Sequence, residues 1–349
     1  MGMDSSALVQ RGFALLKQGQ FAAAEDCATQ ALAVEPGLSP ALNLLAVALK
    51  VQGRDTEAAP VFGKLTQLEP RNIAHWVNLG TTLRALGRTD DALAAYDRAA
   101  RLGEAGADFF YNVGLLHIDR GNFEAARVVL ERARAARPDD AEIAYHFALA
   151  CAETLENFQG IAALADWRRM QGLYTELIGK IGNVLMILGD LRGADEAFAW
   201  AERDPHPDAG ALIQLVLGHE RANRIEAAER RLGQLKQHPG RGAVSDDLTL
   251  AEARLAQRRG RHEEAVRLFG QLVQACAEPG RRHFHQFPLA RSLDELGRQA
   301  EAMATLQEAH ASQVAWIRAT QPEVAERKRE TMRVTRFGCD PGDVAQWSH

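Results

Sequence analysis

Cysteines and long apolar runs are both scarce in this chain of 349 residues. The four cysteines, Cys27, Cys151, Cys276 and Cys339, are widely scattered, with neither metal-ligand spacing nor the density of a disulfide framework. They indicate a reducing compartment, and we expect the cytoplasm. No run of about 18 apolar residues occurs, so no membrane-spanning helix is expected, and the N-terminus lacks the apolar core of a signal peptide.

Aromatic residues and net charge are low as well. Phe, Trp and Tyr make up 6% of the sequence, which suits an alanine-rich helical array better than a β-rich fold. The formal net charge is −5, so the composition indicates neither nucleic acid nor an anionic membrane as a partner. With 46% hydrophobic and 25% charged residues, the chain is otherwise typical of a soluble globular protein.

Sequence motifs of common catalytic sites are missing too. Neither of the glycine-rich nucleotide-binding patterns, G-x-x-x-x-G-K-[ST] and G-x-G-x-x-G, is present, nor are G-x-S-x-G and H-E-x-x-H. His283 and His285 flank Phe284, but they lack a third ligand, and two positions apart on a helix they point in different directions. We therefore expect no catalysis, no cofactor and no metal site within this chain.

Helical periodicity dominates the sequence, and residues 73–106 show it most clearly. Large and small residues recur there at helical spacing on both sides of a glycine: Trp76, Leu79, Gly80 and Leu83 precede Gly87, and Ala92, Tyr96 and Ala99 follow it. Gly80 lets a neighbouring helix approach closely, and Gly87 ends the first helix because a chain turning there can need positive φ. The segment is a helix-turn-helix unit, and its pattern matches the tetratricopeptide repeat, W-x2-L-G-x2-Y…A-x3-F.

The unit recurs with the period of 34 residues expected for such repeats. The turn glycine returns at Gly19, Gly53, Gly87, Gly121 and Gly189, and the small residue of the second helix at Ala24, Ala58, Ala92, Ala126, Gly160, Ala194 and Ala228. Leu155 replaces the turn glycine of repeat five and Asn223 that of repeat seven. The last two turns, Gly260 and Gly297, each follow after 37 residues, so three residues are inserted in each connection. In repeat five, Trp167 stands where alanine is usual, and we expect it to open the helix spacing.

We predict an all-α fold, a right-handed α-solenoid superhelix of about nine tetratricopeptide helix-turn-helix repeats. The array spans residues 5–316, after an N-terminal tail, 1–4, that is native or was added in cloning. Residues 317–349 are predicted to form a capping helix and a linker, because the last repeat otherwise exposes an apolar face to water.

Candidate binding residues lie on the first helices, which line the concave surface of such arrays. Asn78 and Asn112 occupy the same repeat position, and His146 occupies it in repeat five. An asparagine amide donates and accepts at once, so a ladder of them would bind an extended peptide backbone without reading its side chains. Further first-helix residues that would add charge or aromatic contact are Lys50, Arg84 and Tyr145. The alternative is that the asparagines bond to neighbouring repeats or to solvent.

The C-terminal sequence resembles a narrower family. The segments concerned are Phe287-Pro-Leu-Ala-Arg-Ser-Leu-Asp-Glu-Leu-Gly297, then Ala302, Ala309-His310-Ala311 and Asp343-Val-Ala-Gln-Trp347. They resemble the junction in bacterial tetratricopeptide-repeat sulfotransferases, whose last repeat typically reads FALAKALDDLG. The resemblance implies a following sulfotransferase domain that uses PAPS as sulfate donor. This chain lacks that family's phosphate-binding loop, which resembles PRSGTT, so it cannot bind the donor in the family's manner.

Three functions remain open at this point. The leading expectation is a scaffold that binds a protein or peptide in its concave groove, with no catalysis in this chain and with neither nucleic acid nor a membrane as partner. The first alternative, implied by the resemblance, is the N-terminal substrate-recognition region of a bacterial sulfotransferase. The second is a structural module that forms homo-oligomers through a repeat face or the cap.

Overall fold

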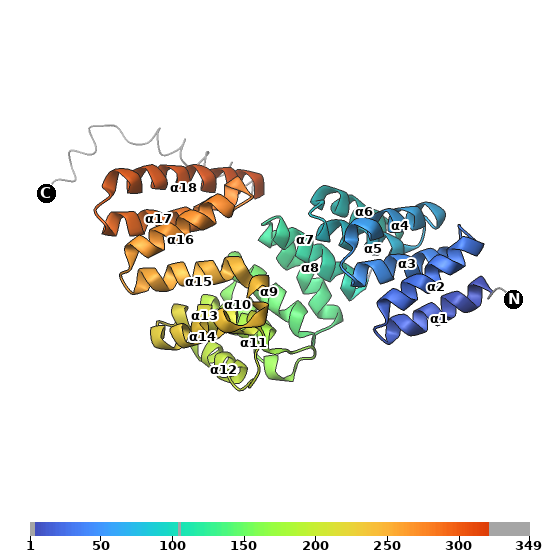
Figure 1. Ribbon diagram of the computed structural model, residues 1–349, viewed down its shortest axis with the longest axis horizontal. Coiled ribbons are helices and arrows are strands. Elements are labelled where there is room, and N and C mark those ends of the chain that lie inside the picture. Colours follow the sequence, from blue (N-terminus) through green and yellow to red (C-terminus); the bar gives the residue numbers. More distant parts are fainter. Residues whose placement is uncertain (1–3, 104–105, 321–349) are drawn as a thin grey trace. The chain divides into compact units, whose positions relative to one another are not determined.

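Helical hairpins dominate the computed structural model, which describes residues 4–103 and 106–320. Within these ranges eighteen α-helices follow one another as nine hairpins (Figure 1). The only β-type contact there is a single bridge between Asp140 and Gln171. The predicted all-α class is therefore confirmed.

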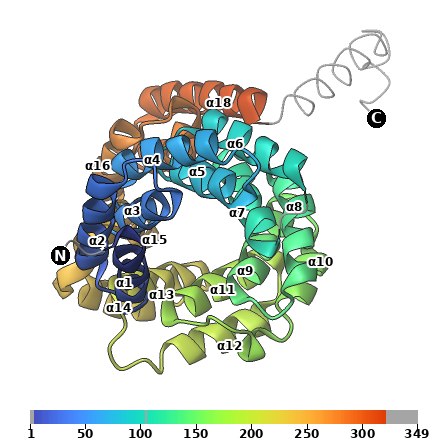
Figure 2. The same cartoon turned by 90° about the vertical axis from the view of Figure 1, so that its right-hand side faces the viewer.

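The N-terminal unit, Met1–Pro138, contains the first four hairpins. They pair α1 (Ser5–Lys17) with α2 (Phe21–Val34), α3 (Ser39–Val51) with α4 (Asp55–Leu68), α5 (Ile73–Ala85) with α6 (Thr89–Leu102), and α7 (Ala107–Asp119) with α8 (Phe123–Ala136). Within this unit, Figure 2 shows α3, α5 and α7 on the inner side of the curve and α4, α6 and α8 on the outer side. The first helices of successive hairpins thus share one face.

The C-terminal unit, Asp139–His349, contains the other five hairpins. They pair α9 (Ala141–Glu153) with α10 (Asn157–Ala163), α11 (Thr175–Leu188) with α12 (Leu191–Ala201), α13 (Ala209–Arg221) with α14 (Ile225–Gln237), α15 (Ser245–Arg258) with α16 (His262–Ala275), and α17 (His283–Glu295) with α18 (Gln299–Thr320). The short 3-10 helices η2 (Pro239–Val244) and η3 (Pro279–Arg282) occupy the last two connections. These are the connections in which the sequence predicts inserted residues.

Left-handed backbone closes the hairpin turns. The seven turn glycines have φ between 70° and 94°; they are Gly19, Gly53, Gly87, Gly121, Gly189, Gly260 and Gly297. Leu155 and Asn223, at the equivalent turns, have φ of 63° and 58°, and no other non-glycine residue in the described ranges has positive φ. The repeat register read from the sequence is therefore confirmed, even where glycine is replaced.

Small residues let the two helices of a hairpin touch. The alanines that mark the second helix, Ala92 and Ala126 among them, are all fully buried. A Cβ atom on Gly80 would lie 2.7 Å from the Tyr96 ring, and one on Gly182 would lie 2.7 Å from the Phe198 ring. The close approach predicted at Gly80 is thus confirmed, and the neighbouring helix is the second helix of its own hairpin.

Repeat five departs from the expectation for Trp167. Helix α10 is only seven residues long and ends at Ala163, and Trp167 begins the 3-10 helix η1 (Trp167–Arg169). The indole is 2% exposed and meets the Trp200 ring edge to face, with the ring centroids 5.5 Å apart. The side chain fills the space beyond a shortened helix, so the premise of that prediction, a tryptophan on the second helix of the repeat, was wrong.

The last described helix crosses the predicted end of the array. Helix α18 is continuous from Gln299 to Thr320, so the boundary predicted between residues 316 and 317 falls inside it. The remainder of the predicted cap and linker, 321–349, lies outside the described residues. None of the described helices combines the length and hydropathy needed to span a bilayer.

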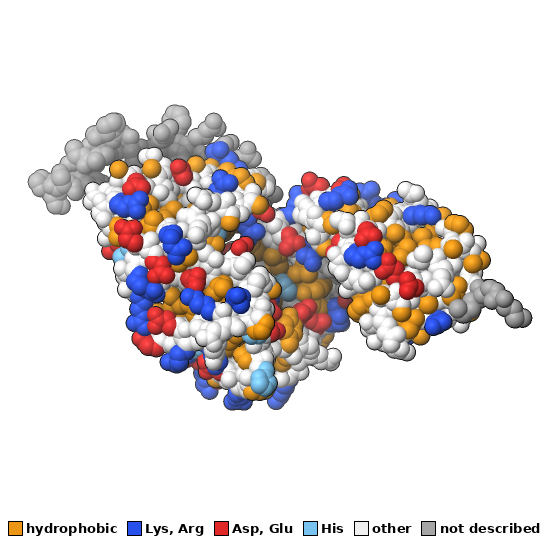
Figure 3. All heavy atoms as spheres, viewed as in Figure 1, with side chains coloured by type: hydrophobic (Ala, Val, Ile, Leu, Met, Phe, Trp, Pro, Cys, Tyr) orange, Lys and Arg blue, Asp and Glu red, His pale blue; other side chains and the backbone are white. Residues whose placement is uncertain are grey.

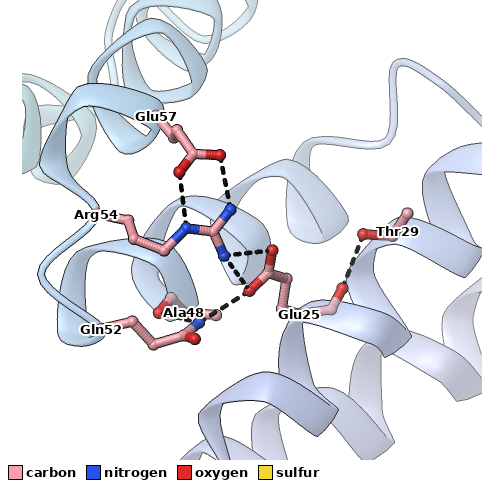
Figure 4. A network of polar contacts seen from close by, with 6 residues as sticks. All are labelled: Glu25, Thr29, Ala48, Gln52, Arg54 and Glu57. Atoms are coloured by element: carbon pink, nitrogen blue, oxygen red, sulfur yellow. Dashed lines mark hydrogen bonds and ion pairs between the residues drawn. The ribbon is translucent and has the colours of Figure 1, made fainter.

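Arginines that follow the turns link successive hairpins. Arg54 Nη1 donates to both Glu25 carboxylate oxygens at 2.8 Å, and Arg54 Nη2 donates to Glu57 Oε2 at 2.6 Å (Figure 4). Gln52 Nε2 adds a hydrogen bond of 2.9 Å to Glu25. At a later turn Arg224 pairs with Asp195 of the preceding hairpin in the same way. The equivalent arginines Arg88, Arg261 and Arg298 each pair with a carboxylate three residues further along their own hairpin. Accordingly, Figure 3 shows basic and acidic side chains interspersed over the face of each unit that it draws.

Candidate functional site

A groove of about 560 Å³ crosses the first helices of the N-terminal unit. Lys50 of α3, Asn78 of α5 and Asn112 of α7 all line it. The other lining residues are Ile73, Ala74, Val77, Thr81, Gly106, Asp108 and Phe109. Three successive hairpins therefore bring three of the predicted site residues to one surface.

The two asparagines differ in how far their amides are engaged. Asn112 Nδ2 donates to the main-chain oxygen of Asp108, one turn earlier on α7, at 2.7 Å. The Asn78 amide has no hydrogen-bond partner among the described residues. Since an amide offers two N–H donors and an acceptor oxygen, both side chains keep groups that can bind a ligand.

Lys50 brings a positive charge to the groove. Burial lowers the pKa of its ammonium group, Asp55 partly opposes this shift, and Arg84 adds to it. Among the described residues no carboxylate lies within ion-pair distance of Lys50. The half-buried ammonium is therefore available to a carbonyl or carboxylate of a ligand.

Arg84 lies beside the groove and does not belong to its lining. Its Nη1 atom pairs with Asp119 Oδ2 at 2.8 Å, which links α5 to α7. This contact joins the two first helices that carry Asn78 and Asn112. Arg84 thus helps to hold the groove wall together in the free protein.

Tyr145 and His146 lie on α9, in the C-terminal unit, and the groove described above is lined without them. Burial, with Glu176 and Tyr174 nearby, raises the pKa of the Tyr145 hydroxyl to about 12. His146 Nδ1 lies 2.8 Å from the main-chain oxygen of Glu142, four residues earlier on the same helix. The two rings meet edge to face, with centroids 4.7 Å apart. The six predicted residues are therefore divided between the two units.

Three polar or aromatic lining residues were not predicted from the sequence: Thr81, Asp108 and Phe109. Thr81 follows Asn78 by three positions and Asp108 precedes Asn112 by four, so each shares a helix face with its asparagine. That spacing could have identified both. Phe109 is nearly buried and packs edge to face on Tyr96, with ring centroids 6.0 Å apart, so it joins the groove to the core.

Metal binding finds no support in the part of the chain that the structure describes. It contains no group of three or more His, Cys, Asp or Glu side chains that could hold a metal ion. Cys27, Cys151 and Cys276 form no disulfide bond among the described residues, and the first two are buried.

The fold and this shared first-helix surface define an α-helical repeat protein. Two family models, both described as tetratricopeptide repeat, match the chain: one at residues 9–73, 77–141 and 114–160, the other at 248–277 and 284–308. The matched segments fall in both units and agree with the observed hairpins. The chain is a tetratricopeptide repeat protein.

Similar proteins add to this picture. A tetratricopeptide repeat protein from Parabacteroides merdae has a TM-score of 0.56 at 16% identity, over 71% of this chain and 98% of its own. PilF from Pseudomonas aeruginosa has a TM-score of 0.51 at 18% identity, over 59% and 94%. At these identities the likeness shows the fold alone.

The probable UDP-N-acetylglucosamine–peptide N-acetylglucosaminyltransferase SPINDLY of Hordeum vulgare is 30% identical over 144 residues, 39% of this chain. The match spans only 15% of that relative's length.

Proposed function

We propose that the chain is a protein-binding scaffold that holds an extended segment of a partner in the groove on α3, α5 and α7. The observation that carries this proposal is that Asn78 and Asn112, at one repeat position, line the same groove together with Lys50. Tetratricopeptide repeats commonly serve as protein-interaction scaffolds, which supports the same conclusion.

The repeat spacing suits a peptide backbone. Packed helices lie about 8–10 Å apart, and an extended chain rises about 3.3 Å per residue. One asparagine per first helix would therefore meet roughly every third peptide group. Each such hydrogen bond contributes about 0.5–1.5 kcal/mol net, so the two amides set the register, and Lys50 and Phe109 would supply further contact.

The test uses peptides selected from a random phage-displayed library against the whole chain. Affinity is then measured for a double variant, Asn78→Ala with Asn112→Ala. We expect binding to weaken by about tenfold or more, as the loss of two hydrogen bonds predicts. The matched control removes two exposed amides from second helices, Gln30→Ala with Gln67→Ala, and should leave binding unchanged. Equal affinity of both double variants would reject the groove.

A second candidate is that the array presents polypeptides to a catalytic domain. The curated relative is named as a transferase that acts on peptide, which favours a role of this kind. The sulfotransferase form of this candidate rests on the resemblance of residues 287–297 and would require a PAPS-binding domain in the same polypeptide. An immunoblot of the native protein decides: a band near 38.2 kDa contradicts this candidate, and a larger band calls for an assay of sulfate transfer to peptides.

For the compartment we propose the cytoplasm. Cys27, Cys151 and Cys276 form no disulfide bond among the described residues, which supports a reducing environment. Fractionation of the source cells followed by immunoblotting tests this directly.

Homo-oligomerisation is the remaining alternative. Sedimentation equilibrium of the purified chain tests it, and a monomer at micromolar concentration would reject it.

A further inference from the structure

A second and larger groove, of about 780 Å³, lies on the first helices of the C-terminal unit. Helices α13, α15 and α17 contribute most of its lining, together with η3 and with Phe269 of the second helix α16. Its lining includes four arginines and no lysine; the arginines are Arg254, Arg258, Arg281 and Arg291. Because the chain as a whole has a net charge of −5, these guanidinium groups form a local excess of positive charge.

One buried carboxylate positions two of these arginines. Glu220 on α13 is 2% exposed, and its Oε2 atom lies 2.7 Å from Arg254 Nη2. Its Oε1 atom accepts a hydrogen bond of 2.8 Å from Arg258 Nε. A single negative charge thus holds two guanidinium groups, and each keeps further N–H donors for a ligand. The two arginines are therefore preorganised, and together with Glu220 they still carry a net positive charge.

The other two arginines are exposed and unpaired. Among the described residues no carboxylate lies within ion-pair distance of Arg281 or Arg291. Phe284, in the first turn of α17, is 52% exposed and lines the same groove. Asp246 and Asp247 line an adjoining hollow of about 470 Å³ that shares Arg281 and Phe284, and neither forms an ion pair with the arginines. The groove thus offers unsatisfied guanidinium groups next to an exposed aromatic ring.

We propose that this groove binds an acidic segment of a partner protein in which Asp or Glu alternates with apolar residues. Guanidinium groups match carboxylates in charge and in planar, bidentate geometry, and the Phe284 ring suits an apolar neighbour. The arginines are spread over α15, η3 and α17 of two hairpins, which fits several carboxylates along a chain better than one small anion. This groove lies in the other unit from Asn78 and would read side chains, so the inference goes beyond the proposed backbone-binding function.

The experiment uses a fluorescein-labelled peptide of alternating Glu and Leu, with fluorescence anisotropy as the measurement on the full chain. The variant reverses both unpaired charges, Arg281→Glu with Arg291→Glu. Arg254 and Arg258 are left intact, because their loss would leave Glu220 as an uncompensated buried charge and could unfold the unit. The matched control is Arg230→Glu with Arg267→Glu, which makes the same change of net charge on the second helices α14 and α16.

We expect the groove variant to bind the Glu-Leu peptide at least about tenfold more weakly than the wild type, with an unchanged melting temperature. The control variant should stay within about twofold, and a peptide of alternating Gln and Leu should not bind. Binding to the wild type should weaken as salt rises. The variant Asn78→Ala with Asn112→Ala should bind this peptide normally, which separates the two grooves.

Two results would overturn the proposal. The first is an equal loss of affinity in the groove variant and in the control, which would show a general effect of net charge. The second is tighter binding of a phosphorylated peptide. If a peptide of alternating phosphoserine and Leu binds more than about tenfold tighter than the Glu-Leu peptide, the groove recognises phosphorylated segments instead.

Discussion

Tyr96 packs against the backbone of Gly80 so closely that a Cβ atom on the glycine would lie 2.7 Å from Cε1 of the ring. The ring cannot retreat easily, because it is buried and also meets Phe109 edge to face. Its hydroxyl donates to Thr81 Oγ1 at 3.2 Å, which fixes the far end of the side chain. The position therefore requires glycine for space, whereas the turn glycines are required for their backbone conformation.

Replacing Gly80 with alanine should destabilise the N-terminal unit. We expect Gly80→Ala to lower the free energy of unfolding by about 1–3 kcal/mol, the usual cost of overpacking a tight interior. The matched control is Gly63→Ala in α4, where the added Cβ would have no atom within 4 Å apart from its chain neighbours and the backbone of its own helix. Alanine is the better helix former, so this control should be stabilised by roughly 0.5–1 kcal/mol. Urea denaturation followed by circular dichroism measures both, and equal effects of the two changes would contradict the packing described here.

A leucine in left-handed conformation should cost the protein stability. Leu155 has φ of 63° and is 85% exposed, so its side chain gives little in return. Such a conformation costs a residue with a Cβ atom about 1–2 kcal/mol. A glycine at this position removes that cost, but the greater freedom of glycine in the unfolded chain offsets part of the gain in stability. We expect Leu155→Gly to raise the free energy of unfolding by about 1 kcal/mol.

Asn223 provides the comparison for this prediction. Asparagine tolerates the left-handed region better than leucine does, so Asn223→Gly should stabilise the chain less than Leu155→Gly. Leu155→Ala keeps a Cβ atom at the turn and should bring little gain. Melting temperatures of the three variants rank the effects, and a gain from Leu155→Ala equal to that from Leu155→Gly would exclude backbone strain as the cause.

The fold was predictable from the sequence because residues with the same structural role recur every 34 residues. Turn glycines such as Gly53 and close-contact residues such as Gly80 mark both the hairpin phase and the faces that meet. Repeat five shows the limit of this reasoning. The sequence shows that Trp167 breaks the pattern, but not that α10 stops at Ala163 to make room for it, because that outcome depends on packing between hairpins.

The groove was only partly predictable, for a similar reason. The repeat position of Asn78 and Asn112 placed them on one face, since that follows from the period alone. The engagement of charged residues depends on partners distant in the sequence. Arg84 is held by Asp119 and Arg254 by Glu220, each from a neighbouring first helix, and a single sequence gives no sign of which charges are left unpaired.

Glu69 should make the N-terminal unit sensitive to acid. Hydrogen bonds from Asn72, Ser39 and His75 lower the pKa of its carboxyl group from 4.5 to about 2. Because the pKa is lower in the folded state, the carboxylate stabilises the fold above about pH 4.5. This contribution is lost as the pH falls from about 4.5 to about 2. The side chain is 41% exposed, so solvent screening keeps the effect modest.

The measurement compares wild type with Glu69→Gln by urea denaturation between pH 5 and pH 2. We expect the wild type to be the more stable at about pH 5 and the difference to shrink steadily as the pH falls. The control is Glu35→Gln at the same position one repeat earlier, where the carboxylate has no hydrogen-bond partner among the described residues. If the free energy of unfolding of wild type and of Glu69→Gln differs by the same amount at every pH, ionisation of the Glu69 carboxyl group does not stabilise the fold.

Trp167 should be among the most important side chains of the C-terminal unit, although no regular repeat has a tryptophan there. Its indole is buried against Leu164 and Trp200, beyond the end of the shortened α10. Trp167→Ala would leave a large cavity that the short 3-10 helix cannot close, and we expect a loss of about 3–5 kcal/mol. Trp200 meets the same ring but is 38% exposed, so Trp200→Ala should cost clearly less. Calorimetry of both variants is the test. If the two variants melt at the same temperature, the Trp167 indole does not fill the space that the shortened α10 leaves.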